Sequence, residues 1–195
     1  MPSLTDVYLP GAFIYKDDVT IIGGTHFILF SQIVIGDFYQ FFNIQTPEMY
    51  EYCMNILRGS GETTDLVISG GACPFANVTS FDLSVYPRLK TLTIGNNGFY
   101  YTEELKLIGL NELESVEIGE NSFTKKKYSF GNDPNRHFYL KNCPKLKSLK
   151  IGDFSLNDYS VIEIENVDAL EVIDMSYHNF YYASLELKSI LIHRE

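Results

Sequence analysis

The sequence is poor in basic residues. It contains 15 Lys and Arg against 25 Asp and Glu, which gives a formal net charge of −10. A surface with this acidic balance repels phosphate groups, so the composition argues against nucleic acid or an anionic membrane as the partner. Tryptophan is absent, whereas phenylalanine and tyrosine number 14 each. Aromatic residues at this level favour strands over helices.

Cysteine is also scarce, and its three occurrences, Cys53, Cys73 and Cys143, lie far apart. An odd, sparse set is not typical of a disulfide framework. No Cys-x-x-Cys spacing indicates a metal site. We therefore expect three ordinary thiols, with Cys143 as a small residue of the core.

Long hydrophobic runs are missing too. The first residues, Met1 to Asp6, lack the basic and apolar regions of a signal peptide. The most apolar early stretch, residues 27–38, is interrupted by Gln32 and Asp37 and is too short to cross a bilayer. On these grounds we expect no membrane contact and a cytoplasmic location by default, which a longer parent protein would leave open.

Recognisable catalytic motifs are likewise absent from the sequence. The four histidines lie in unrelated contexts, and there is no Gly-rich phosphate loop, zinc-binding helix motif or nucleophile elbow. We therefore expect a protein that is not an enzyme and that uses no cofactor or metal. The enzymatic alternative is a parallel β-helix lyase or hydrolase, which would need several carboxylates clustered on one sheet face.

What the sequence does contain is a repeat. Its first segment is an apolar residue, two variable residues, an apolar residue, one variable residue and a last apolar residue. Successive copies begin 26, 33, 26, 24, 33, 24 and 17 residues apart, so the basic period is 24 to 26 residues. The eight copies are Leu4-Val7-Leu9, Phe30-Ile33-Ile35, Thr63-Leu66-Ile68, Leu89-Leu92-Ile94, Leu113-Val116-Ile118, Leu146-Leu149-Ile151, Leu170-Ile173-Met175 and Leu187-Ile190-Ile192.

A second segment follows six of these copies. It begins after a Phe or Leu and contains two apolar residues that alternate with polar ones, which predicts a short strand. The leading residues are Phe13, Phe75, Phe99, Phe123, Leu156 and Phe180. The alternating pairs are Val19 and Ile21, Phe81 and Leu83, Leu105 and Leu107, Phe138 and Leu140, Ile162 and Ile164, and Leu185 and Leu187.

Two copies of the first segment carry a family resemblance. Residues 89–99 read LKTLTIGNNGF and residues 113–123 read LESVEIGENSF. Both resemble the L-x-x-L-x-L-x-x-N-x-L segment of leucine-rich repeats. Phe154 and His178 replace the family's Asn in the next two copies, and the second segment is extended where many members have a helix. The pattern is therefore similar to the irregular repeats of bacterial and protist surface proteins.

The resemblance implies a single β-rich leucine-rich-repeat solenoid over residues 1–195, with about eight short parallel strands on one face and short extended segments opposite. Insertions are expected near 41–59 and 124–137. In the first, residues 47–57 are typical of a helix with Thr46 as its N-cap. We expect the Gly after each first segment to permit a turn. Asn97 and Asn121 should hydrogen-bond the backbone of the turns.

The variable positions of the first segment should face solvent as two columns across the sheet. From the fourth copy onward, the signs of the charges alternate along both columns. These columns are Lys90, Glu114, Lys147, Glu171 and Lys188, and Thr93, Glu117, Lys150, Asp174 and Leu191. Two interpretations stay open: a self-paired solvent face that fixes strand register, and a binding face read through complementary charge.

Three groups of residues are candidates for partner binding. The first is the less charged part of the face around Tyr8, Val34 and Val67. The second is a tyrosine edge, because Phe-Tyr-Tyr occurs twice and tyrosine is favoured at interfaces; its residues are Tyr100, Tyr101, Tyr181 and Tyr182. The third is a basic cluster in the second insertion, formed by Lys125, Lys126 and Lys127 together with Arg136 and His137. Edge packing between coils and a solvated loop are the structural alternatives for the last two.

These observations favour a non-catalytic scaffold for protein–protein interaction or adhesion, with carbohydrate as the second class of partner. The alternative is a structural segment of a longer repeat protein. Neither end of the sequence has a polar capping unit, which leaves three alternatives open: a longer natural chain, end-to-end self-association, or ends that are tolerated as they are. The triplet Asn77-Val78-Thr79 is an N-glycosylation sequon, which matters only in a secreted chain.

Overall fold

A computed structural model describes residues 46–125, 133–176, 178–180 and 183–188. These residues belong to one compact unit, Thr46–Glu195, and the unit Met1–Gln45 lies outside them. The first two predicted copies of the repeat, at Leu4 and Phe30, therefore fall outside the described residues.

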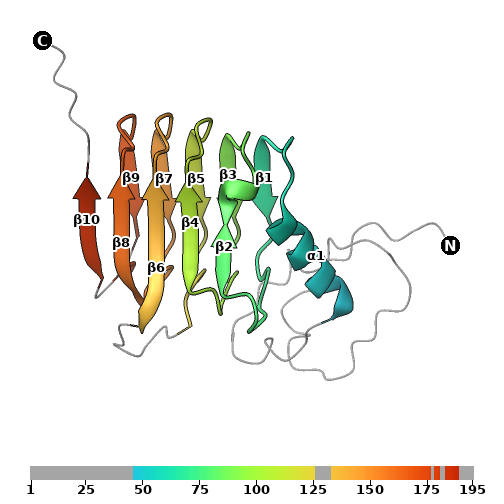
Figure 1. Ribbon diagram of the computed structural model, residues 1–195. Helices are drawn as coiled ribbons and strands as arrows, with labels where there is room; N and C mark the ends of the chain where they lie inside the picture. The colour runs from blue at the N-terminus through green and yellow to red at the C-terminus, as the bar shows by residue number, and fades with distance from the viewer. Residues whose placement is uncertain (1–45, 126–132, 177, 181–182, 189–195) are drawn as a thin grey trace, which may run out of the picture. The chain divides into compact units, whose positions relative to one another are not determined.

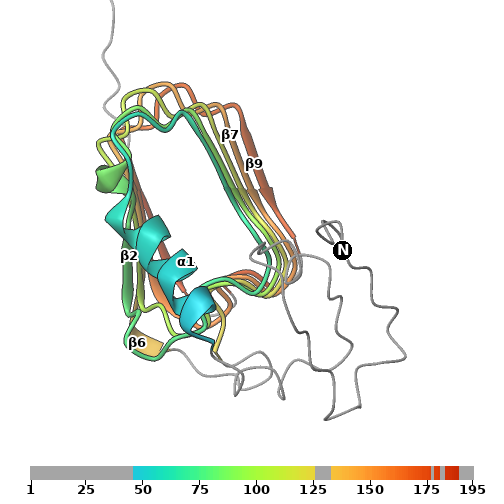
Figure 2. The same ribbon diagram turned by 90° about the vertical axis from the view of Figure 1, so that its right-hand side faces the viewer.

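The unit Thr46–Glu195 is a parallel β-solenoid of about four turns that begins with one helix, α1 (Pro47–Arg58). Two five-stranded sheets form opposite walls of the coils; within each sheet the strands are parallel, and the two sheets run in opposite directions (Figures 1 and 2). Sheet A contains, in order, β1 (Asp65–Ile68), β3 (Thr91–Ile94), β5 (Ser115–Ile118), β7 (Ser148–Ile151) and β9 (Val172–Met175). Sheet B contains β2 (Ser80–Asp82), β4 (Glu104–Ile108), β6 (Asp133–Lys141), β8 (Tyr159–Glu165) and β10 (Ser184–Lys188).

The strands of both sheets form where the sequence alternates. In β3, Leu92 and Ile94 are buried while Thr91 and Thr93 are partly exposed, and β4 shows the same alternation. The same apolar positions stack from coil to coil, because Leu92 pairs with Val116 and Val116 pairs with Leu149. The predicted first segments thus form sheet A and the predicted second segments form sheet B, which confirms the solenoid.

The spacing of the coils follows the predicted steps. Thr91 pairs with Ser115, 24 residues later, whereas Glu117 pairs with Lys150, 33 residues later. The extra residues fall in the predicted insertion near 124–137, but its last part is not a loop. Residues from Asp133 onward already belong to β6, which pairs with β8 across a register shift between Asp133 and His137.

The last predicted copy is assigned differently by the structure. Leu187 pairs with Ile164 and Lys188 pairs with Glu165, so both residues belong to sheet B. Lys188 therefore does not continue the charge column of sheet A, as the spacing had suggested. The rest of the eighth copy, residues 189–195, lies outside the described residues.

Each coil leaves sheet A through a corner in which two residues have the left-handed backbone conformation, with one residue between them. In the coil of β3 these are Asn97 at φ 69° and Phe99 at φ 57°, and the next coil repeats them at Asn121 and Phe123. The Phe99 and Phe123 rings stack inside the coils with centroids 4.9 Å apart. The first described coil has Cys73 at φ 55° in this place. The prediction that Phe75 is the equivalent of Phe99 is therefore wrong by two residues.

The glycines that follow the strands of sheet A allow the backbones of neighbouring coils to pack closely against each other. A Cβ on Gly95 would lie 2.5 Å from the Gly70 nitrogen, and one on Gly152 would lie 2.7 Å from the Glu120 nitrogen. Neither glycine has a positive φ. The predicted reason, conformational freedom in a turn, is wrong for these positions: neighbouring coils approach too closely for a side chain.

The corner is held by a column of hydrogen bonds that lies one residue after the predicted asparagines. The hydroxyl of Ser122 donates to the Gly95 carbonyl oxygen at 2.8 Å and accepts from the Gly98 nitrogen at 3.2 Å. Ser155 repeats this in the next coil, with its hydroxyl 2.5 Å from the Gly119 carbonyl oxygen. The following coil has Asn179 there, whose amide donates to the carbonyl oxygens of Gly152 and Ser155.

Asn97 and Asn121 themselves do not perform the predicted role. The side-chain oxygen of each is buried without a hydrogen-bond partner. Their backbone conformation explains the residue type, because asparagine tolerates the left-handed region better than other residues with a side chain. An asparagine ladder does occur at the opposite corner, where the Asn166 amide donates to the side-chain oxygen of Asn142 at 2.7 Å.

Helix α1 confirms the helix predicted for residues 47–57. The Thr46 hydroxyl accepts from the Met49 nitrogen at 3.2 Å, which caps the first turn. The helix lies across the end of the stack formed by β1 and β2 (Figures 1 and 2). It buries Cys53 and Ile56 against the first coil, so the helix of this insertion covers part of the core.

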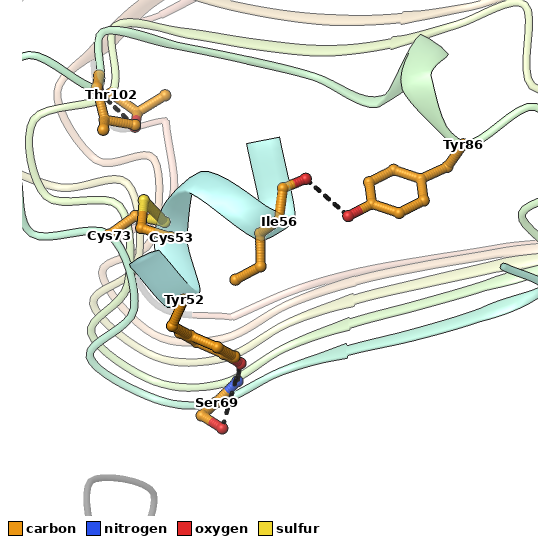
Figure 3. Close-up of a disulfide and its surroundings, with 8 residues drawn as sticks. Tyr52, Cys53, Ile56, Ser69, Cys73, Tyr86 and Thr102 are labelled. Carbon is orange, nitrogen blue, oxygen red and sulfur yellow. Dashed lines mark hydrogen bonds between the residues drawn. A yellow bond between two sulfur atoms is a disulfide. The ribbon is translucent and has the colours of Figure 1, made fainter. Parts of the chain in front are cut away.

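A disulfide fixes this helix to the first coil, contrary to the expectation of three free thiols. Cys53 of α1 bonds Cys73, with their Cα atoms 5.1 Å apart (Figure 3). In the same region the Tyr86 hydroxyl donates to the Ile56 carbonyl oxygen at 2.7 Å. Cys143 is a free, buried thiol, as predicted, and burial raises its pKa to about 11.

Candidate functional site

Two of the predicted candidate groups meet at one corner of the solenoid. The Tyr100 hydroxyl donates to the Lys125 carbonyl oxygen at 3.0 Å, although the two residues are one coil apart. The Lys125 ammonium lies 5.6 Å from the centre of the Tyr101 ring. The two tyrosine rings meet edge to face with their centroids 4.8 Å apart. We call Tyr100, Tyr101 and Lys125 the corner platform.

The platform rests on a buried ion pair. Arg136 and Asp158 are each 1% exposed, and their Nη1 and Oδ2 atoms are 2.9 Å apart. The second terminal nitrogen of the Arg136 guanidinium, Nη2, donates to the carbonyl oxygens of Tyr100 at 3.1 Å and Thr102 at 2.6 Å. The side chain of Arg136 therefore holds the backbone that carries both tyrosines.

Asp158 anchors the lysine in the same way. The Lys125 backbone nitrogen donates to Oδ2 of Asp158 at 3.2 Å. Next to Asp158, the Tyr159 ring lies 5.0 Å from the Arg136 guanidinium, and its hydroxyl donates to the Thr102 carbonyl oxygen at 2.8 Å. Burial raises the pKa of Tyr159, which keeps its hydroxyl protonated as a donor. One buried cluster thus positions all three platform residues.

The position of Arg136 corrects the predicted basic cluster. The sequence placed Arg136 with Lys125 in a solvated loop, but Arg136 lies in β6 and is buried. Its charge is compensated by Asp158 and is not presented to solvent. Lys125 is exposed, whereas Lys126 and Lys127 lie outside the described residues.

The corner platform offers two kinds of contact. The partly exposed tyrosine rings provide flat apolar surface with a hydroxyl group at the rim, a combination favoured at interfaces. Lys125 adds a positive charge, and no carboxylate among the described residues lies within ion-pair distance of its ammonium. A partner with an apolar group beside a carboxylate would satisfy both.

The other candidates are placed differently. Val67 faces outward from β1 and is 72% exposed, as predicted. The two residues expected beside it, Tyr8 and Val34, lie outside the described residues, as do Tyr181 and Tyr182. The predicted patch around Val67 and the second tyrosine pair therefore stay predictions.

The outer face of sheet A has the predicted register. Thr93, Glu117, Lys150 and Asp174 lie side by side in successive strands. No ion pair joins members of this column among the residues that the structure describes. Salt bridges between these side chains therefore do not set the register of the strands. A shallow hollow of about 280 Å³ lies along this column and the glycines that follow it.

Ion pairs do form on the outer face of sheet B, which the sequence interpretation overlooked. The Lys106 ammonium lies 2.7 Å from Glu104, and the Lys141 ammonium lies 2.5 Å from Glu163. A hydrogen bond to the glutamate raises the pKa of each lysine above its usual value. The alternation of charge along the second segments was the available signal, because those positions point outward wherever the apolar residues point in.

Comparison with known proteins adds no relationship: no family model, curated protein or solved structure matches this chain. Within the described part of the chain, no group of three or more His, Cys, Asp or Glu side chains is arranged to hold a metal ion. No helix in that part is long and apolar enough to span a bilayer.

Proposed function

We propose that this protein is a non-catalytic binding scaffold that recognises a protein partner through the corner platform. We also propose that its coils are irregular leucine-rich repeats, on the strength of the L-x-x-L-x-I segment at β3 and the L-x-x-V-x-I segment at β5. The partner chemistry that fits is a protein surface with an aromatic, proline or aliphatic side chain for the tyrosines and a carboxylate for Lys125.

One observation carries the proposal: three exposed or partly exposed residues from two coils are held together by a buried Arg136–Asp158 pair. Removing one partner of such a pair leaves an uncompensated buried charge and costs about 3–5 kcal/mol, so we expect the hydrogen-bonded backbone that it holds to stay in place. A rigid aromatic surface loses little side-chain entropy on binding, which favours affinity. Packing between coils alone would not require a lysine beside the rings.

Sheet B has a second Tyr–Lys pair, which can be compared with Tyr101 and Lys125 of the corner platform. The Lys141 ammonium lies 5.5 Å from the centre of the Tyr139 ring, much as Lys125 lies near Tyr101. Lys141 is already paired with Glu163 and Glu165. Its charge is therefore compensated within the protein, which favours the corner platform as the binding site.

The proposal of no catalysis is supported by the outer face of sheet A. A polysaccharide-cleaving β-helix would need carboxylates gathered on one face. In the column along the hollow, Lys150 separates Glu117 from Asp174. This alternation does not provide two neighbouring carboxylates for acid–base chemistry.

The experiment compares two double variants of the full chain. Immobilised wild-type protein, Tyr101→Ala/Lys125→Ala and the matched control Tyr139→Ala/Lys141→Ala are each incubated with extract of the source cells. Bound proteins are quantified by mass spectrometry. We expect a set of proteins that the wild type and the control retain and that the platform variant loses by about tenfold or more, since loss of a central contact costs at least about 2 kcal/mol.

Equal retention by both variants would show that the platform is not the binding site. The three proteins are also applied to a glycan array. Binding of sugars that depends on Tyr101 but not on Tyr139 would replace the protein partner with a carbohydrate. Circular dichroism of both variants checks that the solenoid is intact.

A further inference from the structure

The turn between Cys73 and β2 presents an asparagine to solvent. Phe75 and Val78 are buried, and the Val78 nitrogen donates to the Phe75 carbonyl oxygen at 2.9 Å. Ala76 and Asn77 form the tip of this turn, and both are exposed. The two buried residues hold the turn in place while the Asn77 side chain points away from the core.

Thr79, two residues after Asn77, is also exposed. Its backbone carbonyl oxygen accepts from the nitrogens of Glu103 at 2.7 Å and Glu104 at 3.0 Å. The coil is thus secured through main-chain atoms, and the side chains of Asn77 and Thr79 contribute no hydrogen bond to it among the described residues. Asn77-Val78-Thr79 is the only Asn-x-Ser/Thr triplet in the sequence.

A second, independent observation comes from the cysteines. Cys73 lies four residues before Asn77 and forms the buried disulfide with Cys53. Disulfides of this structural kind form and persist in oxidising compartments such as the lumen of the secretory pathway. Asparagine-linked glycosylation takes place on the same route, at exposed sequons of secreted chains.

We propose that Asn77 is an N-glycosylation site, modified while the chain passes through an oxidising secretory compartment. The donor is an oligosaccharide carried on a lipid diphosphate. The Asn77 amide nitrogen bonds the anomeric carbon of the sugar, and the bond from that carbon to the diphosphate oxygen breaks. The lipid diphosphate leaves with the electron pair, and the amide nitrogen loses one proton.

The glycan would lie beside the corner platform, on the side of α1. The Thr102 hydroxyl donates to the Val78 carbonyl oxygen at 3.0 Å, so the turn that carries Asn77 is one coil away from Tyr100 and Tyr101. A partner would then approach the platform from the β9 end of the stack. The proposal for Asn77 does not depend on that partner.

The test begins with the chain isolated from the cells that make it. Intact mass is measured before and after treatment with a peptide N-glycosidase, and a non-reducing peptide map assigns the cysteines. We expect the mass of one oligosaccharide to be lost on treatment, with conversion of Asn77 to Asp. We also expect a Cys53–Cys73 linked peptide and Cys143 as a free thiol.

A second arm uses expression behind a secretion leader in a eukaryotic cell, with cell-associated and secreted protein analysed together. The wild type and Thr79→Ser should carry the glycan, whereas Asn77→Gln and Thr79→Ala should not. An unmodified Asn77 in the protein from its own cells would overturn the proposal, whatever the platform variants do in the binding experiment. So would a wild type that stays unmodified in the second arm although its disulfide has formed.

Discussion

At the scale of the residue, the corners of the coils hold buried side chains on backbone that most residues avoid. Phe99, Phe123 and Leu156 all have positive φ and are fully buried. The left-handed conformation costs about 1–2 kcal/mol for a residue with a Cβ. Burying a Phe or Leu side chain returns about 1.5–3 kcal/mol. Stacking of the rings between coils adds to this, which explains why large apolar residues occupy these positions.

The glycine column gives the sharpest prediction at this scale. A Cβ on Gly119 would lie 2.7 Å from the Asn96 nitrogen and 2.8 Å from the Gly95 carbonyl carbon. Because backbone atoms cannot move aside, we expect Gly119→Ala to lower the free energy of unfolding by about 1–3 kcal/mol. Urea denaturation followed by circular dichroism measures the change.

Gly61→Ala is the control for that substitution. Gly61 is exposed, has no heavy atom near its would-be Cβ and lacks a positive φ. Its replacement should leave stability within about 0.5 kcal/mol or raise it slightly. If Gly119→Ala were as harmless as Gly61→Ala, the close approach of the coils at this corner would be wrong.

Single residues also mark where sequence reasoning reached its limit. Positions such as Leu92 and Leu105 could be assigned to the core, because alternation fixes the face of a strand. The hydroxyl groups of Ser122 and Ser155 could not be recognised as a ladder, since their partners are carbonyl oxygens of the preceding coil. Their role depends on which coils stack, and local sequence does not contain that information.

At the scale of the element, α1 was predictable because its signals are local. Thr46, Pro47 and Gly59 mark its two ends within fourteen residues of sequence. Its attachment to the coil was not predictable in this way. The Cys53–Cys73 bond depends on where the corner of the first coil lies, and in that coil a cysteine stands where later coils have phenylalanine or leucine.

The disulfide should matter for stability as much as a large core residue does. We expect Cys53→Ala/Cys73→Ala to lower the free energy of unfolding by about 3 kcal/mol, since the bond closes a loop of about 20 residues. Urea denaturation under non-reducing conditions measures this. The control is Cys143→Ala in the intact background, tested with and without a reductant.

The same variants also show which part of the protein the disulfide stabilises. Because α1 is held by the bond, limited proteolysis should cut the double variant first near residues 59–64, between α1 and β1. A double variant that unfolds at the same urea concentration as the wild type, with no new cleavage there, would show that the helix is held by packing alone.

At the scale of the whole molecule, the two ends of the solenoid differ. Ile68 of β1 is 1% exposed, whereas Met175, the residue at the same register position of β9, is 37% exposed. In a stack whose coils contact only their neighbours, stability is a sum over adjacent contacts. The coil of β9 therefore lacks stabilisation that the coil of β1 receives from the helix. End-to-end self-association stays a prediction that these exposed positions make worth testing.

Hydrogen exchange should show this difference. We expect backbone amides of β9 to exchange at least about tenfold faster than those of β1, which corresponds to about 1.4 kcal/mol in opening free energy. The central strands β5 and β7 should be slowest. Measurement at low protein concentration avoids protection by association. Equal exchange in β1 and β9 would mean that α1 does not stabilise the end that it covers.

The candidate site was predictable in its parts but not as a whole. Tyrosine pairs and a lysine run attract attention in a sequence on chemical grounds alone. Their meeting at one corner results from the stacking of two coils and from an insertion of nine residues beyond the 24-residue step. Arg136 could not be identified as the anchor, because a buried arginine and a solvated one look alike in sequence.

The 24-residue step that recurs between paired strands also suggests how the number of coils in such a chain can change. Ser148 pairs with Val172 as Thr91 pairs with Ser115, so two separate coils have interchangeable boundaries. A duplicated or deleted segment of one whole coil would leave every strand beside an equivalent neighbour. Segments of any other length must be placed between strands, where the extra residues of the 33-residue step also fall in the sequence. Evolution can therefore extend this protein in whole coils and diversify it at its corners, with the sheets unchanged.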